Sequence, residues 1–328
     1  GNISLGWPAH VDSNLLAQLL DLARTQGSLV VAAAGNDGTD ALIRPCIYTG
    51  VICVGSHDPD GALSHFSNHG PGVDVAAPGL GILSLFPTAL TPSVFTDRMG
   101  YEMKSGTSMA SPAVVGVLAR LLNAGASAKE AYARLLLGTR PLSPNPRLAR
   151  SSTSFIQTGA VDLARSLEVQ PQPVMMPVAK RAVDVRWNRR DSKVSVNLEL
   201  ENIWTDAEKS TVEFRLLGRS ALDAGLSPAR VDLGRWSNGE SKSLPLTLEV
   251  KSSRLESELL LEAKITTVDL KTKKSKTETR VIGLEVLSTP DANDPDIQSY
   301  GYRGDSQAIS LLKTANLRSV VSADGKAK

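Results

Sequence analysis

The residue best placed to do chemistry in this sequence is Ser108, within residues 105–112 (SGTSMASP). A small and apolar run at residues 113–122 predicts a buried helix that begins just after Gly106. Ser108 would lie in its first turn, where unpaired backbone N–H groups and the helix dipole stabilise a developing oxyanion. This placement favours nucleophilic attack on a carbonyl carbon. The alternative is that Thr107 or Ser108 only caps the helix.

The octet resembles the nucleophile motif of the subtilisin-like (subtilase, S8-type) serine proteases. Other stretches resemble further segments of that family, in the family's order along the chain. They are residues 4–6 (SLG) for the substrate-binding strand, residues 30–38 (VVAAAGNDG) for the oxyanion-hole strand and loop, and residues 51–55, 66–71 and 73–79 for the strands and loops before the nucleophile. Several ordered matches carry more weight than one motif. The resemblance covers residues 1–168 and implies serine endopeptidase activity.

The resemblance also implies roles for individual residues. Ser108 would be the nucleophile with its own backbone N–H as one oxyanion donor, and the Asn36 carboxamide would be the second donor. Without the matching serine, Asn36 is explained equally well as a turn residue. The pocket for the residue before the scissile bond would be lined by Ser4, Leu5, Gly6, Ala33, Ala34 and Gly35. These small residues predict a roomy, uncharged pocket and cleavage after apolar or bulky side chains.

The general base and the carboxylate that orients it are not evident in this sequence. In subtilases the order along the chain is Asp, His, Ser, so both would precede Ser4. The histidines lie in turns or loops that resemble non-catalytic positions: His10, His57, His65 and His69. We therefore expect an N-terminally incomplete catalytic domain, either a processed piece that needs an N-terminal fragment of the same protease or a truncated sequence. Alone, it is expected to be inactive.

The sequence predicts no metal or cofactor. His65 and His69 are four residues apart, but they flank a Ser-Asn pair in a loop and do not share a helix face. Asp74, with nearby backbone carbonyl groups, resembles a weak cation site of some relatives, which leaves calcium open. However, Gly72 stands where a family glutamate helps to bind the cation.

Length and composition set the frame for these residues. A chain of 328 residues predicts two domains, and 41% hydrophobic with 21% charged residues is typical of a globular protein with a sizeable core. A net charge of +2 favours neither nucleic acid nor an acidic membrane as the partner. Cys46 and Cys53 leave two alternatives, a disulfide in an exported protein or two buried thiols. The resemblance favours a secreted or cell-envelope location.

Helices alternate with buried strands in the first domain, which predicts an α/β fold with a parallel sheet. One helix is expected to begin after Asp12 or Ser13 and to stop at Gly27, a second to follow the serine motif, and a third to extend from Ser127 to Leu137. Residues 159–167 resemble the helix that closes subtilase catalytic domains. Apolar runs predict buried strands at residues 29–34, 51–55, 73–76 and 81–86. Residues 87–104 are expected to form a surface loop.

The pattern changes after residue 168. Residues 169–181 include three prolines and predict a stiff linker. Through residues 182–289, apolar and polar residues alternate between Gly, Asn and Ser turns, which predicts an antiparallel β-sandwich. Residues 290–328 would be a polar tail. The expected architecture is thus an incomplete subtilisin-like α/β domain followed by a β-sandwich.

Two other functions compete with the protease hypothesis. An α/β-hydrolase esterase needs a Gly-x-Ser-x-Gly turn and a histidine after the serine, but Ala110 breaks the turn and no histidine follows His69. A catalytically inactive subtilase fold, or a sandwich that only binds a partner, stays open as the alternative. For the protease, the expected partner is a protein or peptide substrate, with no nucleic acid and no membrane span.

Overall fold

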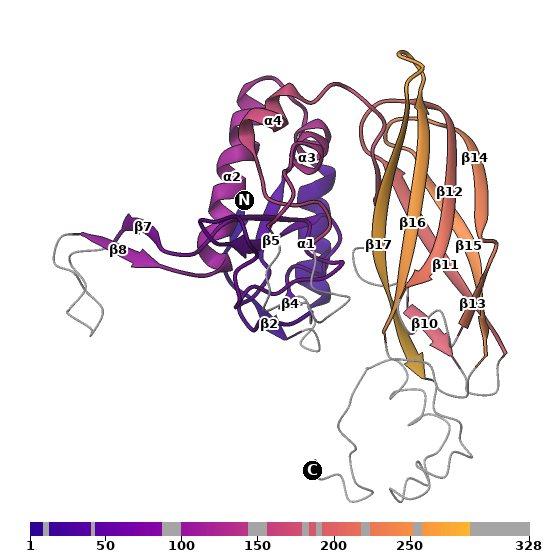
Figure 1. Ribbon diagram of the computed structural model, residues 1–328, viewed down its shortest axis with the longest axis horizontal. Helices are drawn as coiled ribbons and strands as arrows, with labels where there is room; N and C mark the ends of the chain where they lie inside the picture. The colour runs from indigo at the N-terminus through magenta and orange to yellow at the C-terminus, as the bar shows by residue number, and fades with distance from the viewer. Residues whose placement is uncertain are drawn as a thin grey trace, which may run out of the picture.

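A computed structural model describes residues 1–8, 13–40, 43–86, 100–143, 156–178, 184–187, 192–217, 224–251 and 258–288. The first half of the chain forms helices around a short parallel sheet, and long strands form the second half beside it (Figure 1). His10, the centre of the expected surface loop and the expected polar tail lie outside the described residues. Within the described part of the chain, no helix is long and apolar enough to cross a membrane.

A four-stranded parallel sheet lies at the centre of the first half. Its strand order is β1 (Asn2–Ile3), β3 (Val30–Ala33), β5 (Val51–His57) and β6 (Val75–Pro78). The three buried runs expected before residue 80 are therefore confirmed as strands. Alternate residues enter two cores, with Val31 on one face of the sheet and Ala32 on the other. Burial on both faces explains why these runs are unbroken.

Helices cover both faces of this sheet. On one face lies α1 (Asn14–Thr25), and on the other lie α2 (Thr107–Asn123), α3 (Ala128–Leu137) and α4 (Leu163–Glu168). Ser13 and Ser127 accept hydrogen bonds from N–H groups of the first turns, as expected for N-caps. The closing helix begins four residues later than expected, because Ala160 pairs with Ala76 in a β-bridge.

A disulfide joins Cys46 to Cys53 and closes the loop that leads into β5. Both cysteines are fully buried in the core beside α1. Of the two alternatives left by the sequence, the structure therefore supports the disulfide. The bond also anchors the short strand β4 (Ile43–Arg44), which ends two residues before Cys46 and pairs with β2 (Trp7–Pro8).

Residues 81–86, expected to form a buried strand, contribute to an exposed hairpin. Here β7 (Ile82–Leu85) pairs antiparallel with β8 (Tyr101–Lys104), which itself falls within the expected loop. Leu83 and Leu85 are 64% and 78% exposed, so neither enters a core. The prediction of a buried strand is wrong here, because a short apolar run does not indicate which residues will cover it.

Two sheets of long strands form the second half, with the orders β10-β17-β16-β12-β14 and β13-β15-β11-β9. Their strands are β9 (Met175–Pro177), β10 (Asp184–Trp187), β11 (Lys193–Asn202), β12 (Ala207–Leu217), β13 (Ala224–Ser227), β14 (Arg230–Trp236), β15 (Ser241–Val250), β16 (Glu258–Asp269) and β17 (Ser275–Ser288). Leu198, Leu246 and Leu261 are among the residues of both sheets that share one core. The sheets are consistent with the expected sandwich, except that β10 and β17 run parallel.

Part of the expected stiff linker is integrated into the second half. Within residues 169–181, β9 pairs antiparallel with the end of β11. The fully buried side chain of Asn202 makes four hydrogen bonds to the backbone: Oδ1 accepts from the N–H groups of Val174 and Trp204, and Nδ2 donates to the carbonyl groups of Thr205 and Trp236. The amide thereby uses its whole hydrogen-bonding capacity and attaches β9 to the neighbouring strands.

An apolar cluster joins the two halves of the chain. Val174, Met176 and Trp204 from the second half pack in the same buried cluster as Leu121 of α2 and Leu135 of α3. The helix α2, which carries Ser108 in its first turn, therefore contributes its far end to a cluster that also contains residues of the second half.

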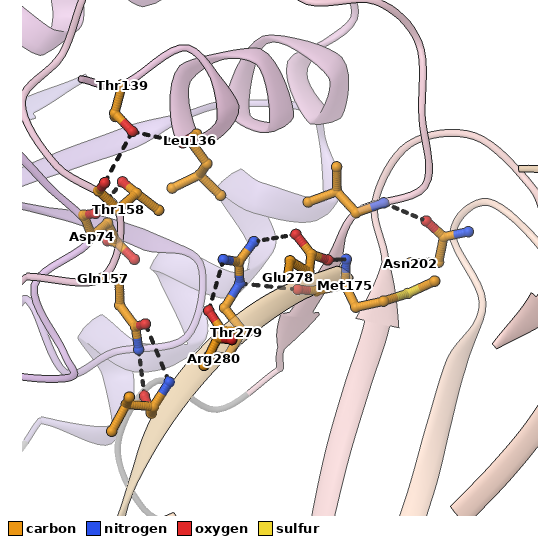
Figure 2. Close-up of polar contacts among 12 residues, drawn as sticks. Asp74, Leu136, Thr139, Gln157, Thr158, Met175, Asn202, Glu278, Thr279 and Arg280 are labelled. Atoms are coloured by element: carbon orange, nitrogen blue, oxygen red, sulfur yellow. Dashed lines mark hydrogen bonds and ion pairs between the residues drawn. The ribbon is translucent and has the colours of Figure 1, made fainter. Parts of the chain in front are cut away.

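Polar contacts lie beside the apolar cluster (Figure 2). Gln157 donates through Nε2 to the Val281 carbonyl and accepts at Oε1 from the Val281 N–H. Arg280 and Glu278 form an ion pair at 2.9 Å, with side chains only 5% and 8% exposed. Both also bond the backbone of Met175, whose N–H donates to Glu278 and whose carbonyl accepts from Arg280. The ion pair therefore attaches β9 to β17 within the second half, whereas the Gln157 contacts connect the two halves.

Replacing Asn202 by alanine should destabilise the protein by about 3 kcal/mol, because four backbone groups around β9 would lose their partner in a buried place. Urea unfolding measures this loss. The matched control is Asn197→Ala on the exposed face of the same strand, for which we expect a change within about 0.5 kcal/mol. Equal effects of the two substitutions would contradict the role of Asn202.

Asp269, at the turn between β16 and β17, should make the free energy of unfolding depend on pH in the acid range. Burial alone raises the pKa of the Asp269 carboxyl, but hydrogen bonds from Thr272, Thr205 and Lys271 outweigh it and lower the pKa. The stabilisation is therefore present above the unfolded pKa of about 3.9 and is lost as pH falls through the lower folded value. Unfolding curves at pH 2–7 should show a weaker acid dependence for Asp269→Asn; an unchanged slope would contradict this account.

Candidate active site

Ser108 lies in the first turn of α2, as the sequence predicts. The N-cap of this helix is Gly106, and no side chain makes a capping hydrogen bond there. The cap alternative for Thr107 and Ser108 is therefore wrong. Ser108 is partly buried, and its Oγ donates to the carbonyl oxygen of Ser4 at 3.4 Å. The hydroxyl thus lies between the start of a helix and the strand expected to bind substrate.

Asn36 lies at the carboxyl end of β3, where the chain turns through Gly35 at a φ of +104°. Its Oδ1 accepts from the N–H of Thr107 at 2.9 Å and from the Thr107 hydroxyl at 3.0 Å. The Thr107 hydroxyl oxygen accepts in turn from the N–H of Gly35 at 3.2 Å. These bonds use the carbonyl oxygen of the carboxamide and leave its Nδ2 group as a donor at the cleft. Asn36 is therefore more than a turn residue, because it joins the strand to the helix.

Two N–H donors converge next to Gly106. A Cβ added at Gly106 would lie 3.4 Å from Nδ2 of Asn36 and 3.7 Å from the backbone nitrogen of Ser108. Both donors therefore lie within 4 Å of one point that glycine leaves empty. A side-chain carboxamide and a backbone N–H are the kinds of donor from which oxyanion holes are built.

A cleft of about 330 Å³ opens at these donors. Of the residues expected to line it, Ser4, Leu5, Gly6, Ala33 and Gly35 do so, together with Asn36 and Ser108. Ala34 does not; it is fully buried in the core beside α1, because neighbouring residues of a strand point to opposite faces.

The sequence did not single out five further lining residues, which are Trp7, Pro8, Asp37, Ile43 and Thr107. Trp7, Pro8 and Ile43 come from the β2–β4 pair. Ile43 and the exposed Asp37 therefore belong to the cleft beside the small residues that the sequence indicated. Two residues of this set could have been indicated by the motifs, since Thr107 precedes the serine and Asp37 follows Asn36 in residues 30–38.

The hydroxyl of Ser4 joins the substrate strand to α2. It donates to the carbonyl oxygen of Ser108 at 2.9 Å and lies 3.1 Å from the hydroxyl of the fully buried Ser111. Ser4 is therefore bonded to the nucleophile helix through its side chain and accepts from Ser108 through its backbone. The position of the segment between β1 and β2 is therefore coupled directly to that of Ser108.

No histidine lines the cleft among the described residues. His57, His65 and His69 lie outside its lining, and His10 lies outside the described residues. His57 is buried at the end of β5, where its Nδ1 lies 2.8 Å from the carbonyl oxygen of Asp58. None of the three described histidines is therefore in a position to take a proton from Ser108.

Asp74, the carboxylate of the suggested cation site, is buried and already hydrogen bonded. Its Oδ2 accepts from the N–H of Cys53 at 2.6 Å, and its Oδ1 from the Tyr132 hydroxyl at 3.3 Å. Burial, followed by the nearby Asp74 charge, raises the pKa of Tyr132 well above its usual value, so the hydroxyl stays a donor. The described residues contain no group of three His, Cys, Asp or Glu arranged for a metal ion. Both oxygens of the Asp74 carboxylate therefore already accept a hydrogen bond from the protein.

Comparisons with known proteins agree with the residue motifs. Residues 2–149 match the model of the subtilase family. Over 124 residues the chain is 42% identical to the thermophilic serine proteinase of Bacillus sp. (strain AK1), an alignment that covers 38% of this chain and 28% of the relative. It is 41% identical over 133 residues to thermitase of Thermoactinomyces vulgaris, covering 40% of this chain and 44% of the relative.

One solved structure, of proteases from Pseudoalteromonas arctica PAMC 21717, aligns with 33% identity and a TM-score of 0.43, covering 51% of this chain and 49% of that one. The chain spans less than half the length of the two curated relatives. The family match and the sequence identities concern the first half of the chain. That half, residues 2–149, belongs to the subtilase family of serine proteases.

Proposed function

We propose that this chain is the part of a subtilisin-type serine endopeptidase that carries the nucleophile and the oxyanion donors. The observation behind the proposal is the convergence of Ser108 Oγ, the Ser108 N–H and Asn36 Nδ2 at one end of a cleft. Peptides or proteins would be the substrates, since the segment Ser4-Leu5-Gly6, which connects β1 to β2, lines the cleft beside Ser108. Ala33 and Gly35 line the opposite wall.

The reaction would begin with attack of the Ser108 oxygen on the scissile carbonyl carbon, while the hydroxyl proton passes to a base. The carbonyl oxygen gains negative charge and accepts hydrogen bonds from the Ser108 N–H and Asn36 Nδ2. Loss of the amine leaves an ester on Ser108, and water then hydrolyses it. The start of α2 contributes the positive end of its dipole to the same oxygen.

We propose that the base and its carboxylate, a His and an Asp, come from polypeptide outside this chain. Support comes from the cleft, which is lined by no histidine among the described residues. In the described sheet β1 is the edge strand and pairs only with β3, so the other edge of β1 is available for a further strand. This chain alone should then hydrolyse no peptide, and mixing it with an N-terminal fragment that carries both residues should restore activity.

We further place the protein outside the cell or in the cell envelope. A disulfide between Cys46 and Cys53 suits an oxidising compartment. A relative from Dichelobacter nodosus, 39% identical over 127 residues, is named extracellular basic protease.

The second half would serve as an accessory β-sandwich that supports the catalytic half through the shared apolar cluster.

Fluorophosphonate labelling tests the nucleophile. In the protease assembled from this chain and its N-terminal fragment, we expect one adduct on Ser108 and none in Ser108→Ala. Ser105→Ala is the matched control, because Ser105 bonds only the Gly81 N–H and should leave labelling intact. An adduct elsewhere would contradict the assignment. No adduct at all would favour the competing function, a catalytically inactive binding module.

Asn36→Asp tests the oxyanion donor selectively. Aspartate keeps an oxygen for the two Thr107 hydrogen bonds but replaces the Nδ2 donor with a second acceptor. We expect kcat to fall about 10²–10³-fold, the cost of removing one such donor in subtilisin, with a much smaller change in KM. A rise in KM at unchanged kcat would show that Asn36 only binds the ground state.

Gly106→Ala tests the empty point between the donors. The added methyl group would lie within 4 Å of both, and the φ of +155° is rarely adopted by residues with a side chain. We expect a loss of about 1–2 kcal/mol in stability and a fall in kcat of at least about 10-fold, because the methyl group takes the place of the oxyanion. The control is Gly116→Ala in the same helix, where nothing lies within 4 Å and activity should persist.

A further inference from the structure

The side chain of Ile43 lies in the cleft between Gly6 and Gly35, in a space that we call the slot. A Cβ added at Gly6 would lie 2.0 Å from Cδ1 of Ile43, and one added at Gly35 would lie 3.1 Å from the same atom. Gly6 belongs to the wall that contains Ser4, and Gly35 immediately precedes Asn36. The Cδ1 methyl group of Ile43 therefore contacts both walls of the cleft. It can come this close because neither glycine has a side chain.

This slot is where the side chain next to the scissile bond would enter. The Oγ of Ser108 is bonded to the carbonyl of Ser4, so a substrate carbonyl held at Ser108 lies at the start of the same wall. A side chain on its acyl side then points between that wall and the β3 turn at Gly35. Ile43 meets it from the opposite side of the slot.

The backbone restrains Ile43 in this position. Pro8 and Ile43 face each other in the β2–β4 pair, and the disulfide anchors the segment two residues after β4. A β-branched side chain has few rotamers to escape into. Moving it aside for a large substrate group would compress neighbours in a packed wall, which is costly.

We infer that Ile43 shortens the pocket and restricts the residue before the scissile bond to small side chains such as alanine, serine or glycine. This inference names the substrate class of the site and rests on the proposed function. It also reverses the expectation from the sequence, in which small lining residues suggested cleavage after bulky side chains. The small residues are present, but Ile43, which the sequence analysis did not consider, fills the space between them.

The test compares peptides that differ only at this position. For the protease assembled with its N-terminal fragment, kcat/KM for Ac-Ala-Ala-Pro-Ala-p-nitroanilide should exceed that for the Phe analogue by at least about 10-fold, since a single excess methylene already changes such ratios 10–200-fold. In Ile43→Gly and Ile43→Ala, the ratio should shift toward Phe by about 10²-fold. Ile43→Val, which is one methylene shorter, should give an intermediate ratio.

Ile47→Ala is the matched control, because Ile47 lies four residues further along and packs in the core beside α1 instead of the cleft. It should lower stability without changing the Ala-to-Phe ratio. A wild-type protease that prefers Phe, or a ratio that Ile43→Gly leaves unchanged, would overturn the inference while the proposed function stands.

A binding measurement separates the two proposals if no hydrolysis occurs. The peptide acids Ac-Ala-Ala-Pro-Ala and Ac-Ala-Ala-Pro-Phe would be titrated into the assembled Ser108→Ala protein, with the backbone NMR signals of Gly35 and Asn36 as the readout. Tighter binding of the Ala peptide, inverted in the Ser108→Ala, Ile43→Gly double variant, supports the role of Ile43 even without catalysis. Equal binding, or tighter binding of the Phe peptide in Ser108→Ala, contradicts it.

Discussion

The candidate site depends on the two hydrogen bonds that Oδ1 of Asn36 accepts from Thr107. They connect the end of β3 to the first turn of α2 across 71 residues of sequence. One carboxamide thereby holds the helix start in place with its oxygen and keeps its nitrogen for a ligand. Because Gly106 adds no side chain there, this nitrogen and the Ser108 N–H share one empty point. A serine in the same motif without this connection would lie at an ordinary helix start.

The nucleophile helix is held at both ends. At its start it bonds to Asn36 and to Ser4, and near its end Leu121 enters a cluster with Trp204 and Val174 from the second half. The buried Arg280–Glu278 pair lies beside that cluster and bonds the backbone of Met175. Desolvation makes such a pair costly unless its geometry is fixed, and here the backbone of Met175 satisfies both partners. The far end of α2 and residues of the second half thus belong to one buried cluster.

The cleft shows how a pocket can be built by residues that a motif does not contain. Its walls, with Gly6 and Gly35, follow from the strands on either side, whereas its depth is set by Ile43 from a two-residue strand. That strand is positioned by pairing with β2 and by the nearby disulfide. The β2–β4 pair therefore determines where Ile43 lies in the cleft, while β3 and α2 determine the position of Ser108.

By itself the sequence determined those features that depend on neighbours along the chain. Caps at Ser13 and Ser127, the unbroken apolar strands and the serine motif were all predicted, because capping and strand burial are local properties. The direction of Ala34, the exposure of β7, the pairing of β9 and the intrusion of Ile43 were decided only by tertiary structure. Each depends on which distant residue lies opposite, and a short apolar run carries no information about its partner.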